Sequence, residues 1–356
     1  VSFTLSDAKY GNSNTVLERG EKLELRMRWK NFLGTTKNAT VRLSSPSPNV
    51  TILNPDFTLG ALGTNEEKNN EADPFVIQLA DVEALNEQLD MFFTITDDGY
   101  SDYGGLSFIQ QPTYRDHNAN EIVTTISNDG NIGFDDFTGV RGKGYIFRNN
   151  GFNVLFEGAL MIGATVNGTP QVVDVARNES GNVQSADFVG ATPVVMTTPG
   201  TIAAQEGITE FTDNSAPEFD KIGVTVKLHT YEFTETGLTG LVFLKYTIIN
   251  TSAQALTDLH AGLFFDWDIG VGATSDLSDF DTTSLTAFAS EAGTRVPTVI
   301  GPTVLSRGKP THFVSINNPD ADSKTVFGIH NGFTKEEKWR ALSSGIWHIQ
   351  SIITDV

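Results

Sequence analysis

The feature that most constrains the fold is a strict alternation of apolar and charged residues in one nine-residue run, residues 22–30 (KLELRMRWK). Every second residue of this run is apolar, namely Leu23, Leu25, Met27 and Trp29. Because successive side chains of a β-strand point to opposite faces, the pattern predicts a strand with one buried and one solvated face.

Short β-rich runs follow at the spacing expected of an antiparallel sandwich, and loops rich in Asn, Pro, Gly and Asp separate them. The runs are residues 40–43, 50–53, 75–79, 91–96 and 106–109. Residues 80–89 favour a short helical turn. We therefore expect residues 1–112 to form an Ig-like β-sandwich module.

The turn-rich segment 111–120 (QPTYRDHNAN) predicts the module boundary, with a larger β-sandwich module in residues 113–356. Strands are predicted at residues 122–126, 145–147, 154–162, 171–175, 222–233, 241–250 and 259–269. Residues 241–249 are apolar on both faces, which predicts a central strand covered on both sides. Residues 163–216, rich in Gly, Thr, Pro and Asn, are expected to be mostly loop.

One short helix is predicted near the end of the chain. Thr334 and Glu337 have the spacing of a capping box, the residues KEEKWRALSS favour a helix, and Gly345 suits its C-terminal cap. The predicted fold class is therefore all-β, with tandem antiparallel β-sandwich modules and one helix in the second.

The composition excludes several classes of partner and site. Lys and Arg total 24 against 44 Asp and Glu, a formal charge of −20, so nucleic-acid phosphates and anionic membrane surfaces would repel the chain. The chain has no cysteine, which excludes disulfides, thiolate zinc sites and cysteine nucleophiles. No apolar run approaches the roughly 18–20 residues of a membrane span.

Oxygen-bearing side chains recur at short spacing near the N-terminus. Asp7, Asn12, Asn14, Glu18 and Glu21 precede the alternating strand. Such a turn has the ligand types that Ca²⁺ prefers, since this ion takes six to eight oxygens. The alternative is an Asx-rich turn that hydrogen-bonds its own backbone.

A second acidic cluster follows a predicted strand end. Asp266 and Asp268 flank Trp267, and three more aspartates lie on the loop that follows, Asp276, Asp279 and Asp281. The cluster is compatible with a second calcium site, or with a glycosidase carboxylate pair that has Trp267 as a sugar platform. It is also compatible with a strand-end turn in which the carboxylates cap and the tryptophan packs, which we favour.

The N-terminal pattern D-x3-GN-x-N-x2-LE-x-GE, followed by an alternating strand, resembles the Ig-like module found after the catalytic domains of secreted bacterial peptidases. In that module Asp is commoner at the position of Asn14, and Gly at the position of Thr15. The resemblance implies an Ig-like fold for this segment.

Segments of the second half occur in the order found in the β-rich region that follows the protease domain of certain exported subtilisin-like serine peptidases. These peptidases belong to bacteria with type nine secretion. The segments are residues 151–163 (GFNVLFEGALMIG), 222–233, 241–250 (LVFLKYTIIN), 261–269 (AGLFFDWDI) and 338–345. The resemblance implies attachment to such a peptidase rather than activity in this chain.

The catalytic contexts of that peptidase family, G-T-S-M around the serine and H-G-T-H around the histidine, are both missing. The six histidines occur singly, and His117 is expected to make a loop contact rather than act as a base. We therefore expect no enzyme activity.

The expected function is that of a non-catalytic accessory region of a secreted or cell-surface bacterial protein, acting as a spacer, docking or stabilising module. Its expected partners are other domains of the same polypeptide. The alternative is a structural subunit in which identical copies assemble through sheet edges into a filament or surface layer. A carbohydrate-binding module, with Trp267 or Trp339 exposed, is a third possibility. The start at Val1 and the strand-like residues 352–356 lead us to expect a longer parent polypeptide.

Overall fold

The predicted all-β class is confirmed. In the computed structural model, 51% of the chain is in strands and 3% in the one helix of the described part. The structure describes residues 1–14, 16–149, 151–270, 276–292, 299–305, 312–319 and 327–350, so the strand expected at residues 352–356 lies outside it. Two compact units divide the chain, Val1–Pro112 and Thr113–Val356.

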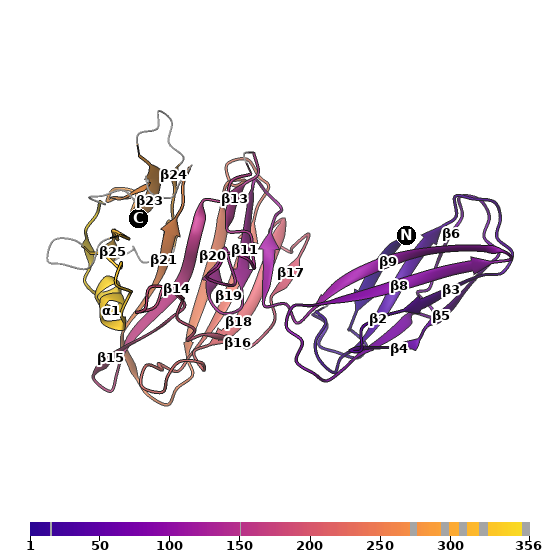
Figure 1. Cartoon of the computed structure of the whole chain (residues 1–356), viewed down its shortest axis with the longest axis horizontal. Helices are drawn as coiled ribbons and strands as arrows, with labels where there is room; N and C mark the ends of the chain where they lie inside the picture. The colour runs from indigo at the N-terminus through magenta and orange to yellow at the C-terminus, as the bar shows by residue number, and fades with distance from the viewer. Residues whose placement is uncertain are drawn as a thin grey trace. The chain divides into compact units, whose positions relative to one another are not determined.

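Unit 1 consists of two antiparallel sheets whose inner faces share one hydrophobic core (Figure 1). The first sheet has the order β1 (Ser2–Ser6), β2 (Lys22–Lys30), β7 (Phe75–Leu79) and β4 (Val50–Asn54), and β6 (Glu67–Asn69) also pairs with β2. The second has the order β5 (Asp56–Gly60), β3 (Ala39–Ser44), β8 (Glu87–Asp97) and β9 (Tyr100–Gln110).

Strand β2 has the predicted buried face. Its four alternating apolar side chains are buried in the core between the sheets, and Trp29 stacks on Phe57 with ring centroids 5.6 Å apart. Glu24, on the face predicted to be solvated, is buried as well. It forms ion pairs with Lys9 and Arg26, so its charge is compensated.

The helical turn expected at residues 80–89 is absent, because residues 80–86 are irregular and β8 begins at Glu87. Val82 and Leu85 are both exposed, so a helix here would bury no apolar face. Short helices depend on such packing for their stability, and the segment therefore stays irregular.

Unit 2 contains two larger antiparallel sheets. The seven-stranded sheet contains β10 (Tyr114–His117), β11 (Ile122–Ser127), β12 (Asn131–Ile132), β13 (Tyr145–Phe147), β14 (Leu155–Val166), β15 (Thr169–Asp174) and β21 (Leu256–Trp267). The five-stranded sheet contains β16 (Val189–Gly190), β17 (Val195–Thr197), β18 (Gln205–Thr212), β19 (Val224–Glu232) and β20 (Val242–Asn250).

Smaller elements complete unit 2. Strands β22 (Asp276–Asp281), β23 (Thr286–Glu291) and β24 (Val299–Ile300) form an antiparallel sheet, and β25 (Phe313–Val314) pairs in parallel with β26 (Ile346–Trp347). The predicted helix is present as α1 (Lys335–Ser343), and both hydrogen bonds of its capping box, between Thr334 and Glu337, are formed.

The core of unit 2 lies in three layers. Helix α1 lies on one side of β14 and β21, and the five-stranded sheet lies on the other (Figure 1). Gly163 on β14 permits this close approach, because a Cβ atom there would lie 2.9 Å from the ring of Trp339. Overpacking of that kind is costly, so glycine at this position lets the helix dock.

One strand prediction for unit 2 is wrong, and one strand was not predicted. Most of residues 163–216 lie outside strands, as expected, but the segment also contains the unpredicted strand β18, in which Gln205 and Thr209 occupy inward positions. Strand β20, expected at the centre of a sheet, pairs with β19 alone and forms the edge of the five-stranded sheet within the described part of the chain.

Candidate functional site

The N-terminal acidic turn brings the five predicted residues together. Asp7 follows β1 and is fully buried, its main-chain carbonyl accepts from the amides of Tyr10 and Gly11, and its carboxylate accepts from the amide of Asn14 at 3.1 Å. The amide group of Asn12 donates to Glu18 at 2.6 Å. The chain thus folds back on itself through an Asx-rich turn, as the alternative interpretation predicts.

Glu21 closes this turn from the side of β2. Its carboxylate accepts from the amide of Glu18 at 3.2 Å, and a Cβ atom on Gly11 would lie 2.0 Å from its Oε1. The pKa of Glu21 is raised to about 7, first because burial disfavours its charge and also because the charges of Asp7 and Glu18 lie nearby. In the described residues, no group of three or more Asp, Glu or His side chains has an arrangement suited to a metal ion. Calcium binding here stays a prediction.

The second acidic cluster is dispersed. Asp266, at the buried end of β21, pairs with the guanidinium of Arg177 and also accepts a hydrogen bond from the side-chain amide of Asn318 at 3.3 Å. Asp276 accepts from the amide of Ile269 at 2.8 Å. A protein cation therefore compensates the charge of Asp266.

The remaining members of this cluster are turn residues or lie apart from it. Asp281 accepts from the amide of Thr283 and the hydroxyl of Ser284, as a capping residue does. The amide of Asp268 donates to the carbonyl of Val154 at 3.0 Å. Residues 271–275 of the loop lie outside the described part. Calcium binding at this end of β21 also stays a prediction.

Trp267 is not an exposed sugar platform. It is only 8% exposed, it stacks on Phe265 at 4.9 Å, and the ring of Tyr145 meets it edge-on. Trp339 packs against the core of unit 2 from α1. The packing alternative is therefore the one that the structure supports for Trp267.

A buried polar group joins the two large sheets of unit 2, and sequence reasoning missed it. His117 lies on β10 rather than in a loop, and its Nε2 hydrogen-bonds the hydroxyl of Thr230 on β19. Its Nδ1 lies 3.1 Å from the side-chain oxygen of Gln205 on β18 and 3.8 Å from Glu232. The alternation of β19 could have indicated this buried group. Its inward positions continue past Leu228 to Thr230 and Glu232.

The hydrogen-bond partners determine the tautomer of His117. The side-chain oxygen of Gln205 also accepts from the amide of Asn118 at 2.8 Å, so this atom is an acceptor towards Nδ1 as well. Nδ1 therefore carries the proton, and Nε2 accepts the hydroxyl proton of Thr230. Burial lowers the pKa of His117 to about 4, so the ring is neutral at pH 7.

A hydroxyl bonded to a neutral imidazole is the arrangement that activates a nucleophile in hydrolases. Here His117, Thr230 and Glu232 are fully buried. A substrate therefore has no access to Thr230 in this conformation. The group joins β10, β18 and β19 by buried hydrogen bonds.

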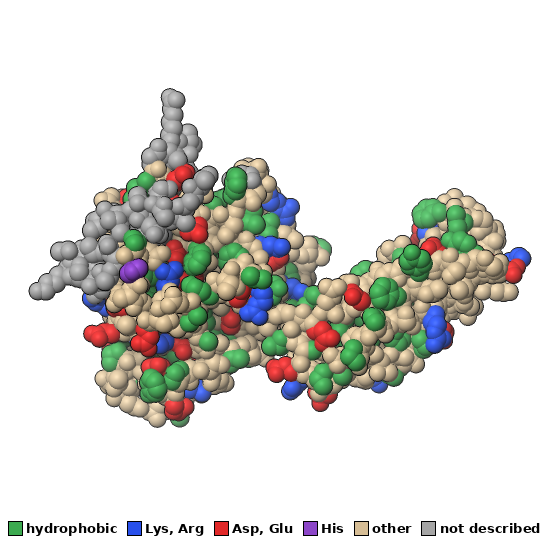
Figure 2. All heavy atoms as spheres, viewed as in Figure 1, with side chains coloured by type: hydrophobic (Ala, Val, Ile, Leu, Met, Phe, Trp, Pro, Cys, Tyr) green, Lys and Arg blue, Asp and Glu red, His purple; other side chains and the backbone are tan. Residues whose placement is uncertain are grey.

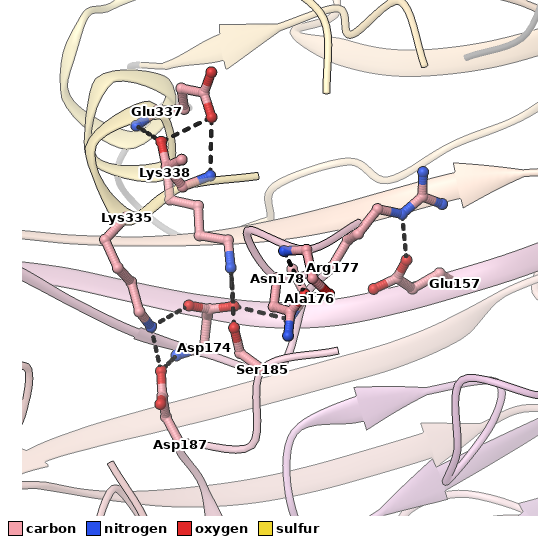
Figure 3. Close-up of polar contacts among 12 residues, drawn as sticks. Glu157, Asp174, Ala176, Arg177, Asn178, Ser185, Asp187, Lys335, Glu337 and Lys338 are labelled. Carbon is pink, nitrogen blue, oxygen red and sulfur yellow. Dashed lines mark hydrogen bonds and ion pairs between the residues drawn. The ribbon is translucent and has the colours of Figure 1, made fainter. Parts of the chain in front are cut away.

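A second missed cluster holds α1 on the sheet (Figure 3). Lys338 is fully buried, and its Nζ lies 2.6 Å from Asp174 and 3.1 Å from the hydroxyl of Ser185. Lys335 binds the other oxygen of Asp174 at 2.7 Å and also pairs with Asp187. The sequence carried a signal for this burial. Lys338 precedes Ala341 by three residues and Leu342 by four, so the three side chains share one helix face, and that face is buried.

A further ionic group lies beside this cluster. Arg177 pairs with Asp266, and its Nε lies 3.6 Å from a carboxylate oxygen of Glu157 on β14 (Figure 3). Burial raises the pKa of Glu157 to about 7, and the charge of Arg177 opposes that shift. These charges connect β14, β21 and the segment that follows β15.

Comparison with protein-family models and with curated proteins finds no match for this chain. Within the described residues, no helix is both long and apolar enough to cross a membrane.

Proposed function

We propose that this chain is a non-catalytic accessory region of a secreted or cell-surface bacterial protein, acting as a spacer, docking or stabilising module. The observation that carries this proposal is that the side chains capable of catalysis are buried or paired with opposite charges. His117 and Thr230 are enclosed between the sheets, and the buried Lys338 is paired with Asp174. The attachment to a peptidase rests on the sequence resemblance.

The test is reaction with a fluorophosphonate probe, which labels activated hydroxyl nucleophiles. We expect no labelling of the folded chain under conditions that label an active subtilisin-like peptidase completely. The matched variant is Thr230→Val, which removes the hydroxyl next to His117 and keeps the side-chain shape. Stoichiometric labelling that disappears in Thr230→Val would assign catalysis to this group and overturn the proposal.

A second candidate function, assembly of identical copies through sheet edges, is favoured by the position of β20. This strand is long and apolar, and among the strands that the structure describes it forms a sheet edge. Such edges pair readily with other strands.

A further inference from the structure

The edge formed by β20 is regular along its whole length. All nine residues, Val242 to Asn250, pair with β19 without a register shift. In the described part of the chain β20 has no second partner strand. Its outer side therefore presents an unbroken row of backbone groups, which is the template that strand addition requires.

The hydrophobic core is incompletely covered along this strand. Leu244, Tyr246 and Ile248 pack against the core of unit 2 but are only partly buried, whereas the inward residues of β19 are fully buried. At the two ends of β20, Leu241 is 45% exposed and Ile249 is 37% exposed. On the face of unit 2 seen in Figure 2, hydrophobic side chains reach the surface among charged ones of both signs.

Other long edges of the two units carry features that discourage pairing. Strand β9 contains Asp102 and a Gly104–Gly105 pair, and β15 contains Pro170. The pairing of β21 with β14 has two register shifts, and Asp258 on β21 has a φ of 48°. Strand β20 has no acidic residue, glycine or proline, and Lys245 is its single charge.

We propose that a second copy of this chain docks on this edge, with the two β20 strands antiparallel about a two-fold axis at Tyr246. Directly opposed residues of an antiparallel pair share a face, so a two-fold axis must place one residue opposite its own copy. Only the axis at Tyr246 pairs all nine residues. An axis at Lys245 would oppose two like charges, which is destabilising.

The strand is self-complementary in this register. Phe243 faces Ile249 and Leu244 faces Ile248, so four of the apolar residues meet each other. Lys245 faces Thr247 and Val242 faces Asn250, so no like charges are opposed. Pairing at the axis places the two Tyr246 side chains next to each other on the inward face of the joined sheet.

This pairing deepens the proposed docking role and makes it specific. A two-fold contact uses the same surface on both copies and closes on itself, so the product is a dimer rather than a filament. Because one strand pair is smaller than a standard interface, we expect a dissociation constant on the order of 1–100 µM.

The test is sedimentation equilibrium of the full chain and of two variants at Thr247, an exposed residue that faces Lys245 of the other copy. We expect the parent to reach twice the chain mass of 38.6 kDa. Thr247→Lys opposes two lysines twice per dimer and should raise the dissociation constant roughly tenfold, whereas Thr247→Glu should preserve or strengthen the dimer. Far-ultraviolet circular dichroism and the thermal midpoint verify that both variants fold.

The control is Thr257→Lys, which adds the same charge to the exposed edge of β21 and should leave the dimer unchanged. A monomer up to roughly 300 µM, or larger polymers, would overturn the proposal. So would a dimer that Thr247→Lys leaves intact, or one that Thr257→Lys disrupts. None of these outcomes affects the fluorophosphonate test, so failure of the dimer and failure of the non-catalytic role are distinguishable.

Discussion

At the residue scale, some inward positions of the strands hold polar side chains, and a search for hydrophobic patterns does not find these positions. Thr230 and Glu232 occupy the inward face of β19, where their neighbours Val226 and Leu228 are apolar. A buried polar group must find a partner, because leaving it unpaired costs about 1–3 kcal/mol. The partner of Thr230 is His117, which lies 113 residues earlier in the chain.

Acid should destabilise unit 2 through His117. Its pKa is about 4 in the folded protein against about 6.5 in the unfolded chain, so below pH 6.5 the unfolded chain binds the proton first. The stability that depends on neutral His117 is fully present above pH 6.5. About 3 kcal/mol of the free energy of unfolding is lost as the pH falls to 4. Urea unfolding at pH 7, 5.5 and 4.5 measures this loss. The variant His117→Gln should have a shallower pH dependence, and an identical dependence in parent and variant would contradict the assignment.

Calcium binding at the N-terminal turn is the second prediction at this scale. The carboxylate of Asp7, which is fully buried, and that of Glu21, which is half-buried, lie close together, so a cation between them should raise the thermal midpoint. The stabilisation is roughly 2.7 kcal/mol when free calcium is about a hundred times the dissociation constant. Thermal unfolding in chelator and in added calcium measures it.

Two double variants locate the calcium ion. The shift should disappear in Asp7→Ala with Glu21→Ala and persist in Asp266→Ala with Asp268→Ala. The opposite pattern would move the ion to the end of β21, and an unchanged midpoint in the parent would exclude both sites.

At the scale of elements, α1 shows how a locally specified helix acquires a tertiary position. Its capping box and helix-forming residues are local, so its start at Lys335 follows from the sequence. Its docking depends on residues far along the chain, since Lys338 reaches Asp174 and Trp339 lies over Gly163.

Replacing Lys338 by methionine should therefore be much more costly than an equivalent change at an exposed ion pair. Lys338→Met keeps the length of the side chain but leaves the buried carboxylate of Asp174 with one cation fewer. Breaking a buried pair costs about 3–5 kcal/mol, whereas an exposed pair contributes roughly 0–1 kcal/mol. The control is Lys227→Met, since Lys227 pairs with Glu210 on the exposed face of the five-stranded sheet. Equal losses in the free energy of unfolding would show that the cluster does not hold α1.

At the scale of the whole molecule, the division at Pro112 separates the hydrophobic core of unit 1 from the two hydrophobic clusters of unit 2. The core of unit 1 is made from β2, β3, β7 and β8 and their neighbours, and every buried residue of that core precedes residue 94. A unit with its own core is expected to fold alone.

A fragment of residues 1–112 should therefore unfold cooperatively, with a single transition in urea that is the same by tryptophan fluorescence and by circular dichroism. Trp29 reports on the centre of this core. Its buried neighbour Phe75 offers a matched variant, Phe75→Leu, which should lower the midpoint without removing cooperativity. A gradual, non-cooperative change in the unmodified fragment would contradict the independence of unit 1.

The sequence alone determined the elements whose pattern is local. Strand β2 alternates in its own residues, and α1 has its cap and its helix formers within one segment, so both are predictable without a partner. The sequence also predicted that the residues of the acidic turn from Asp7 to Glu21 lie together, because they are close in the chain.

Only the tertiary structure decided the rest. Strand β18 has Gln205, Gly207 and Thr209 facing inward, so it has no hydrophobic period, and the edge position of β20 depends on which strands pair. Pairing across a sheet is a long-range choice, and an apolar strand has the same sequence at the centre of a sheet as at its edge.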